Sequence, residues 1–124
     1  MILIYILTGI PARRNHCAFC VDFNSMRVLK KGAEENRIEE LDRFEESDAF
    51  TESEKAALAY AEVMTFSDRA VGDALFDRLR RHYDDDALVE LTGLIALQNA
   101  SSKFNAALDL PAQGLCRIPS RPGA

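Results

Sequence analysis

Two cysteines three positions apart, Cys17 and Cys20, are the residues of this sequence best suited to chemistry. Asn15 precedes them and can accept hydrogen bonds from the first amides of a helix, so we expect a helix over residues 16–31 with both cysteines in its first turn. Unpaired amides at a helix start stabilise a thiolate, and a second thiol nearby can close a disulfide with the oxidised first one. This spacing is typical of a redox dithiol.

Two other interpretations of the pair remain open. A zinc site needs further cysteine or histidine ligands at matching spacing, and the chain offers only His16, His82 and Cys116 for that purpose. The two cysteines can also be buried structural residues. The spacing favours redox chemistry over a structural role, and a structural role over metal binding.

His16 directly precedes Cys17 and is the third candidate for the site. Histidine changes charge near neutral pH, so this side chain could favour the thiolate or carry its proton. It could equally lie exposed in a loop, because neighbours in sequence need not point to the same side. His82 is expected on the surface at a helix end, and Cys116 in a loose C-terminal tail.

Length and charge narrow the classes of function. The 124 residues allow one domain with a modest core, and the hydrophobic share of 48% is ordinary for a globular protein. A net charge of -5 argues against nucleic-acid binding, which needs clustered lysine and arginine. The apolar run at residues 1–7 is shorter than the roughly 20 residues that span a bilayer, and no basic segment precedes it as in a signal peptide. We therefore expect a cytoplasmic protein, in which cysteines are usually reduced or catalytic.

Periodicity and capping signals predict an all-α domain of about five or six helices over residues 1–124, with a loose tail from about residue 111. The isoleucine-rich block at residues 2–10 can be a strand or a buried helix, and Pro11 is expected to end it. Thr51 and Glu54 form a capping-box pattern. The remaining helices are expected over residues 33–44, 51–65, 71–83 and 87–108.

Three segments of the chain, in this order, resemble the carboxymuconolactone decarboxylase and alkylhydroperoxidase D-like superfamily. Residues 15–22 (NHCAFCVD) resemble its active-site segment, residues 50–62 (FTESEKAALAYAE) the helix after an acidic loop, and residues 88–100 its long closing helix. The resemblance covers roughly residues 15–115. It implies an all-helical fold that assembles into homo-oligomers, commonly dimers, trimers or hexamers. The decarboxylase branch is disfavoured, since its chemistry does not depend on a C-x-x-C pair.

Members of the thiol branch reduce hydroperoxides or exchange disulfides, so the resemblance implies Cys20 as the attacking sulfur and Cys17 as the resolving one. Position in the helix alone would favour the reverse order. Tyr5 and Asn24 stand where this branch has a glutamate and a histidine that form a proton relay. Tyrosine is a poor base near neutral pH, and asparagine cannot take up a proton. Either His16 replaces the relay, or the thiol chemistry is weak or different.

The sequence thus predicts a thiol-dependent peroxidase or disulfide reductase that needs no metal and no organic cofactor and takes electrons from a partner thiol protein. The alternative is a catalytically weak or inactive member of the superfamily, in which the pair is a redox sensor or a structural link. A homo-oligomer is also expected, because residues 1–10 and the alanine-rich residues 56–61 offer more apolar surface than a chain of this size easily buries. No nucleic-acid or membrane partner is expected.

Overall fold

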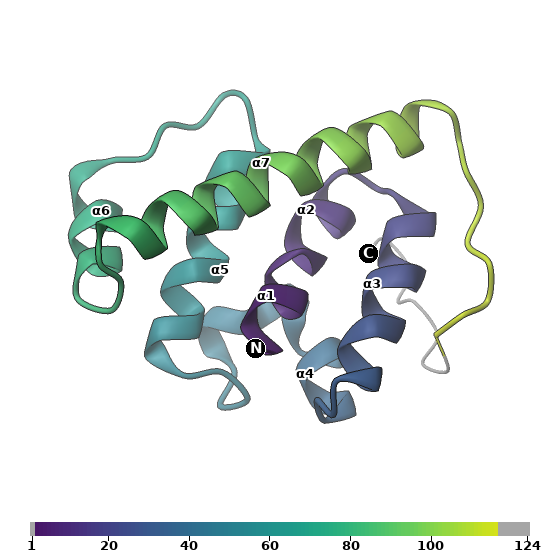
Figure 1. Ribbon diagram of the computed structural model, residues 1–124, viewed down its shortest axis with the longest axis horizontal. Helices are drawn as coiled ribbons and strands as arrows, with labels where there is room; N and C mark the ends of the chain where they lie inside the picture. The colour runs from purple at the N-terminus through teal and green to yellow at the C-terminus, as the bar shows by residue number, and fades with distance from the viewer. Residues whose placement is uncertain (1, 117–124) are drawn as a thin grey trace.

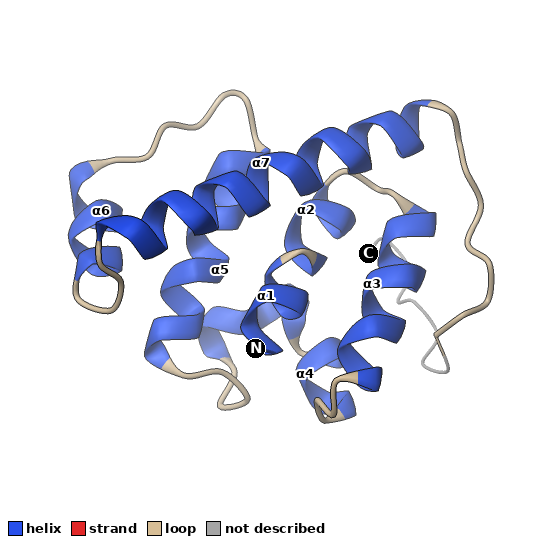
Figure 2. Ribbon diagram, in the orientation of Figure 1, coloured by secondary structure: helices blue, strands red, loops and turns tan. Residues whose placement is uncertain are grey.

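The structure, a computed structural model, describes residues 2–116, and over that range it consists only of helices and loops (Figures 1 and 2). This confirms the all-α prediction. The elements are α1 (Ile2–Leu7), α2 (Gly9–Arg14), α3 (Ala18–Lys30), α4 (Glu35–Glu39), the 3₁₀ helix η1 (Leu41–Glu46), α5 (Glu52–Thr65), α6 (Asp73–Arg80) and α7 (Asp85–Ala107). They outnumber the predicted helices because two predicted segments each divide into two short helices. In this part of the chain no helix has the length and apolar character that crossing a membrane requires.

The N-terminal block forms the centre of the fold as two helices. α1 and α2 lie between α5 and α3, and α7 crosses the face of the molecule nearest the viewer in Figure 1. The prediction that Pro11 ends the first element is wrong, because Pro11 lies in the first turn of α2. Proline costs little there, since first-turn amides have no partner within the helix. Gly9 lets α2 approach η1 closely, because an added Cβ would lie 2.6 Å from Leu41 Cδ2.

One hydrophobic core joins these helices, and it includes most of the residues expected to make an oligomer contact. Ala56, Ala57 and Ala61 of α5 are fully buried inside the chain, as is Leu7 of α1. The alanine-rich segment therefore does not supply the outer apolar surface that the sequence suggested. That surface lies on α7, where several large apolar side chains remain exposed.

Capping side chains set the helix boundaries in the second half of the chain. Thr51 Oγ1 accepts from the Glu54 amide, and the Glu54 carboxylate accepts from the Thr51 amide, which confirms the capping box. α5 ends at Thr65, as expected. Asp84 caps α7 by accepting from the Ala87 amide at 2.9 Å, so the long helix also begins close to its expected start.

An ion-pair network fixes the C-terminal end of α2, just before the cysteines. Arg14 Nε donates to Glu62 Oε1 of α5 at 2.8 Å, and Arg14 Nη1 donates to Asp42 Oδ1 of η1 at 3.1 Å. Arg13 is buried, with its Nε 3.6 Å from Asp42 Oδ1. The short helix that leads into the candidate site is therefore held on two sides.

Candidate functional site

The backbone between α2 and α3 turns sharply and places both cysteines at the start of α3. His16 takes a left-handed conformation with φ of 55°. The amide of Cys17 then donates to Ala12 O at 3.0 Å, which folds the turn against α2. The prediction that Asn15 caps α3 is wrong: the cap is Cys17, whose Sγ accepts from the Cys20 amide at 3.2 Å. The helix therefore begins later than expected, and the pair spans its cap and its first turn.

Cys17 and Cys20 are joined by a disulfide, and their Cα atoms lie 5.2 Å apart. Both side chains are buried, with exposed fractions of 1% and 4%. The side chains packed around them are those of Ala12, Phe19, Val21 and Ala106. A disulfide is one of the two states between which a redox dithiol cycles. The structure thus holds the pair in bonding geometry and shields it from bulk solvent.

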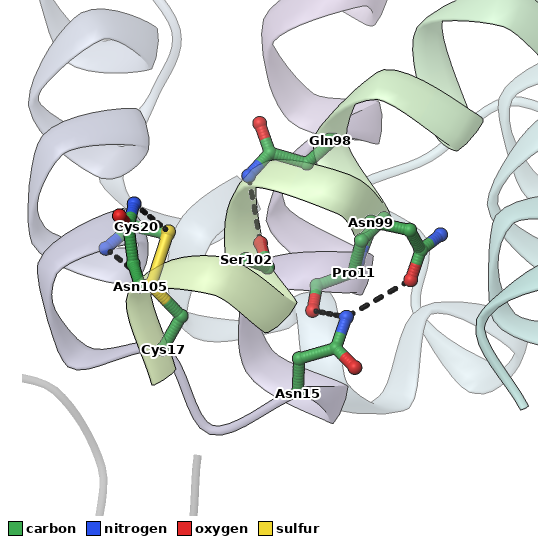
Figure 3. Close-up of a disulfide and its surroundings, with 8 residues drawn as sticks. All are labelled: Pro11, Asn15, Cys17, Cys20, Gln98, Asn99, Ser102 and Asn105. Atoms are coloured by element: carbon green, nitrogen blue, oxygen red, sulfur yellow. Dashed lines mark hydrogen bonds between the residues drawn. A yellow bond between two sulfur atoms is a disulfide. The ribbon is translucent and has the colours of Figure 1, made fainter. Parts of the chain in front are cut away.

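Asn105 of α7 reaches the pair from a distant part of the chain (Figure 3). Its Nδ2 donates to Cys20 Sγ at 3.5 Å. Each sulfur therefore has an N–H group directed at it, the Cys20 amide at Cys17 and the Asn105 side chain at Cys20. Hydrogen bonds of this kind stabilise an anionic sulfur. No spacing in the sequence places Asn105 beside Cys20, so this residue was absent from the predicted site.

Asn15 connects the turn before the cysteines to α7 through side-chain hydrogen bonds (Figure 3). Its Nδ2 donates to Asn99 Oδ1 at 2.9 Å and to Pro11 O at 2.8 Å. Its Oδ1 accepts from Lys103 Nζ at 2.8 Å. Asn99 is buried and donates in turn to Thr65 Oγ1 of α5 at 3.3 Å. The two amide side chains therefore connect α2, α5 and α7 next to the disulfide.

The other predicted ligands and bases are more exposed than the two buried cysteines. The His16 side chain is exposed in the turn, and His82 is exposed beyond the end of α6. Cys116 is a free cysteine of intermediate exposure in the C-terminal segment. Among residues 2–116, no three histidine, cysteine, aspartate or glutamate side chains are grouped so that they could hold a metal ion.

Tyr5 and Asn24, at the two positions where the resemblance implies a proton relay, line one small cavity among α1, α2, α3 and α4. The cavity volume is about 10 Å³, close to the space that one water molecule occupies. Asn24 is buried, and its Nδ2 has no hydrogen-bond partner. The cations of Arg27 and Lys31 lie against the Tyr5 ring, and they hold the pKa of Tyr5 below its usual value. The relay positions thus meet in space, but neither of them carries a carboxylate or an imidazole.

Asp22, on α3 just after Cys20, ties the C-terminal segment to this helix. Its carboxylate accepts from the backbone amides of Gln113 at 3.0 Å, Leu115 at 2.9 Å and Cys116 at 2.7 Å. The sequence predicted a loose tail from about residue 111, and these bonds hold its first residues against α3. Burial by itself raises the pKa of Asp22, but the amides of Leu115, Cys116 and Gln113 outweigh burial and leave the pKa below its usual value.

Replacing Asp22 with asparagine should free this segment, because the amide carries no charge and has one acceptor oxygen in place of two. We expect a loss of about 1.5–3 kcal/mol in the free energy of unfolding, the range for hydrogen bonds to charged groups, measured by urea denaturation at pH 7. Because the folded-state pKa is lowered, the stabilisation is present above the unfolded-state pKa of about 3.9 and is lost as the pH falls through the folded-state pKa.

The matched control is Asp77→Asn, which removes an exposed carboxylate on α6. It should change the free energy of unfolding by less than about 0.5 kcal/mol. Equal losses in the two variants at pH 7 would contradict the role of Asp22. The role would also be contradicted if the free energies of unfolding of Asp22→Asn and the parent differed as much in strong acid as they do at pH 7.

Sequence comparison connects this chain with known proteins. The carboxymuconolactone decarboxylase family matches residues 12–63. The uncharacterized protein YnjA of Escherichia coli (strain K12) is 46% identical over 105 residues, which are 85% of this chain and 58% of YnjA. The uncharacterized protein YdfG of Bacillus subtilis (strain 168) is 35% identical over 98 residues, which are 78% of this chain and 67% of YdfG. The chain therefore spans little more than half the length of YnjA.

Solved structures share the fold. One is the protein ATU0492 from Agrobacterium tumefaciens, which is described as of unknown function and as a candidate antioxidant defence protein AhpD. Its structure matches this chain with a TM-score of 0.85 and 25% sequence identity, and the match covers 96% of this chain and 78% of ATU0492. The debrominase Bmp8 has a TM-score of 0.84 and 26% identity, covering 93% of this chain and 62% of that one. Both matches extend well beyond residues 12–63, to nearly the whole chain.

Proposed function

The chain belongs to the carboxymuconolactone decarboxylase family and has the alkylhydroperoxidase D-like fold, and from this premise we propose that it is a thiol-dependent peroxidase or disulfide reductase whose redox centre is Cys17 and Cys20. The observation that carries the proposal is the disulfide at the start of α3, with an N–H donor directed at each sulfur. The pair takes two electrons from a partner thiol protein and passes them to the substrate. We place this exchange in the cytoplasm, where thiol systems return such pairs to the dithiol.

With a hydroperoxide, the reaction has two steps at the sulfurs. The Cys20 thiolate attacks one peroxide oxygen, the O–O bond breaks, and the alcohol leaves after taking up a proton, so that Cys20 becomes a sulfenic acid. The Cys17 thiol then attacks the Cys20 sulfur, and water leaves as the disulfide forms. The donor dithiol reopens it through a mixed disulfide. Asn105 supports this order, because its amide is placed to stabilise the Cys20 thiolate.

We propose His16 as the group that exchanges protons between this pair and solvent, because its exposed imidazole lies one residue before Cys17. Replacing His16 with asparagine keeps a residue type that tolerates a positive φ but removes the imidazole ring. We expect a fall of up to about tenfold in the rate of peroxide consumption. A rate equal to that of the parent would remove His16 from the mechanism.

One observation favours a second candidate function, a redox sensor or a structural pair. Both sulfurs are buried in an apolar cluster, as in cysteines that serve packing. A sensor would form its disulfide once and hold it, whereas an enzyme must reopen it rapidly. The two functions therefore differ in turnover with a dithiol donor rather than in the presence of the disulfide.

The test measures substrate loss and protein thiols together, with fully reduced protein. tert-Butyl hydroperoxide, cystine and 2,3,4-tribromopyrrole form the substrate panel; the last is included because it was crystallised in complex with a variant of the debrominase Bmp8. Consumption of one peroxide or disulfide for each two thiols lost, repeated for many cycles when a dithiol donor is present, supports the enzyme. A single cycle with no turnover supports the sensor, and thiols that do not react with peroxide or cystine overturn both redox functions.

A further inference from the structure

A partly exposed aromatic surface begins at the redox pair and follows α3. Phe19 packs against the apolar cluster that encloses the two cysteines. Phe23, one turn further along the helix, stacks on Phe19, with the ring centroids 6.0 Å apart and the ring planes 5° from parallel. Both side chains are half-buried, so part of each ring remains in contact with solvent. The two rings therefore offer a place for an apolar group of a molecule that reacts at the cysteines.

Two exposed cations mark the end of this surface that lies away from the cysteines. Arg27 Cζ is 5.6 Å from the centroid of the Phe23 ring and 4.8 Å from that of Tyr5, on the neighbouring helix α1. Lys31 Nζ is 5.3 Å from the Tyr5 centroid. Within residues 2–116 neither cation forms a salt bridge with a carboxylate, although the chain carries a net charge of -5. Cations without an acidic partner favour a negatively charged ligand.

The redox sulfur of Cys20, the Phe23 ring and the two cations lie in a row along one side of α3. Successive members of the row are three or four residues apart, at positions 20, 23, 27 and 31, which is the spacing of side chains on one helix face. At a rise of about 1.5 Å per residue, Arg27 lies about 10 Å and Lys31 about 16 Å from Cys20 along the helix axis. An extended chain of single bonds advances about 1.2 Å per bond, as the polypeptide backbone does, so these spans correspond to roughly 8–14 bonds.

We propose that this row binds the hydroperoxide of a long-chain carboxylate. The O–O group lies at Cys20, the hydrocarbon lies on the two phenylalanine rings, and the carboxylate lies at Arg27 and Lys31. The inference rests on the proposed peroxidase function and specifies the substrate of the same site. Arginine stays charged at neutral pH and can donate two parallel hydrogen bonds to one carboxylate, so Arg27 is the main anchor.

Turnover of this substrate balances as for any hydroperoxide. The Cys20 thiolate takes the terminal peroxide oxygen, the O–O bond breaks, and the hydroxy carboxylate leaves after its oxygen takes up a proton. The Cys17 thiol then attacks the resulting sulfenic acid, the disulfide closes and water leaves. The carboxylate itself does not change, so Arg27 acts through substrate binding rather than through the chemical step.

Steady-state kinetics with dithiothreitol as electron donor test the substrate class. The substrates are linoleic acid hydroperoxide (the 13-isomer), whose peroxide and carboxylate lie within the expected span, and its methyl ester, both kept below the concentration at which they form micelles. We expect kcat/KM for the acid to exceed that for the ester by at least about tenfold, because the ester cannot form charge-assisted hydrogen bonds. Sodium chloride at about 1 M should reduce this preference, since salt screens exposed charges. Membrane lipids carry such chains as esters, so the same comparison separates a free acid from a lipid.

Arg27→Gln removes the main anchor. The ratio of kcat/KM for the acid to that for the ester should fall about tenfold in this variant, mainly through a higher KM for the acid. Arg69→Gln is the matched control, because the Arg69 guanidinium likewise lies over an aromatic ring, 4.2 Å from the Phe66 centroid, but in the loop after α5. This control should keep the ratio of the parent. A parent ratio near one, or the parent ratio in Arg27→Gln, would overturn the proposal.

Binding of decanoate tests the row without turnover. In NMR spectra of the oxidised parent, the backbone amide signals of Phe19, Phe23 and Arg27 should shift with added decanoate until they saturate, and these shifts should be lost in Arg27→Gln. No shift, or shifts confined to α7 around the exposed Leu97, would overturn the binding site even if hydroperoxides are consumed. Saturable shifts in a protein that consumes no hydroperoxide would support the anion site and reject the proposed peroxidase function.

Discussion

Replacing Cys20 with serine is expected to lower the rate of hydroperoxide consumption by at least roughly 100-fold, because serine cannot supply a thiolate to attack the O–O bond. The measurement is the loss of tert-butyl hydroperoxide with dithiothreitol as electron donor. Cys20 is the sulfur to which Asn105 donates, so the variant removes the thiolate that this amide is placed to stabilise. The exposed part of the site is unchanged, since Cys20 is only 4% exposed.

Cys17→Ser should behave differently from Cys20→Ser. The first attack on peroxide remains possible in this variant, so we expect one rapid equivalent of peroxide loss and then slow turnover, with a sulfenic acid trapped on Cys20. Cys116→Ser is the control, because this thiol is free and belongs to the segment that Asp22 holds. It should consume peroxide at the parent rate.

The pattern of the three variants decides between two orders of attack. Rapid first-equivalent loss in Cys20→Ser, but not in Cys17→Ser, would assign the attack to Cys17, the sulfur that accepts from the first-turn amide of α3. If the Cys20→Ser variant consumes peroxide as fast as the parent, the proposed enzyme function is excluded. Slow single oxidation in the parent, with no turnover, would leave the pair as a sensor.

Local sequence patterns were sufficient to predict the structure where the hydrogen bonds that define it join residues only a few positions apart. The side chains of Thr51 and Glu54 each accept a hydrogen bond from the other residue's backbone amide. The capping box and the start of α5 could therefore be predicted from the residues at positions 51–54. Asp84 caps α7 in the same local way. The cysteine pair was also identifiable, because a separation of three residues at a helix start brings two sulfurs together wherever that helix lies.

Predictions failed where a distant element decides what a residue does. Asn15 has the right side chain for a cap, but its amide is used by Asn99 on α7, and Cys17 takes the capping position. Asn105 meets Cys20 only because α7 folds back over α3. Likewise, the first part of the tail that looked loose by composition, residues 113–116, is held by the carboxylate of Asp22, whereas residues 117–124 lie outside the described residues. Each of these contacts joins residues far apart in the chain, which no periodicity in the sequence encodes.

The N-terminal block raises a further question about stability, because the family match begins at residue 12 and so excludes α1. Within the structure, Leu7 of α1 is fully buried in the core that contains Ile10 and Leu58. Leu7→Ala should therefore leave a cavity at the centre of the fold. We expect a loss of about 2–5 kcal/mol in the free energy of unfolding, measured by urea denaturation at pH 7.

That loss is a large part of the roughly 5–15 kcal/mol that stabilises a domain, so the thermal midpoint should fall by about 10 °C or more. Ile4→Ala is the matched control in the same helix, because Ile4 is 41% exposed and its truncation should cost less than about 1 kcal/mol. Equal losses in the two variants would show that α1 is peripheral to the core. A large loss confined to Leu7→Ala would show that the segment before the family match is needed to hold α2, and through α2 the turn that presents Cys17.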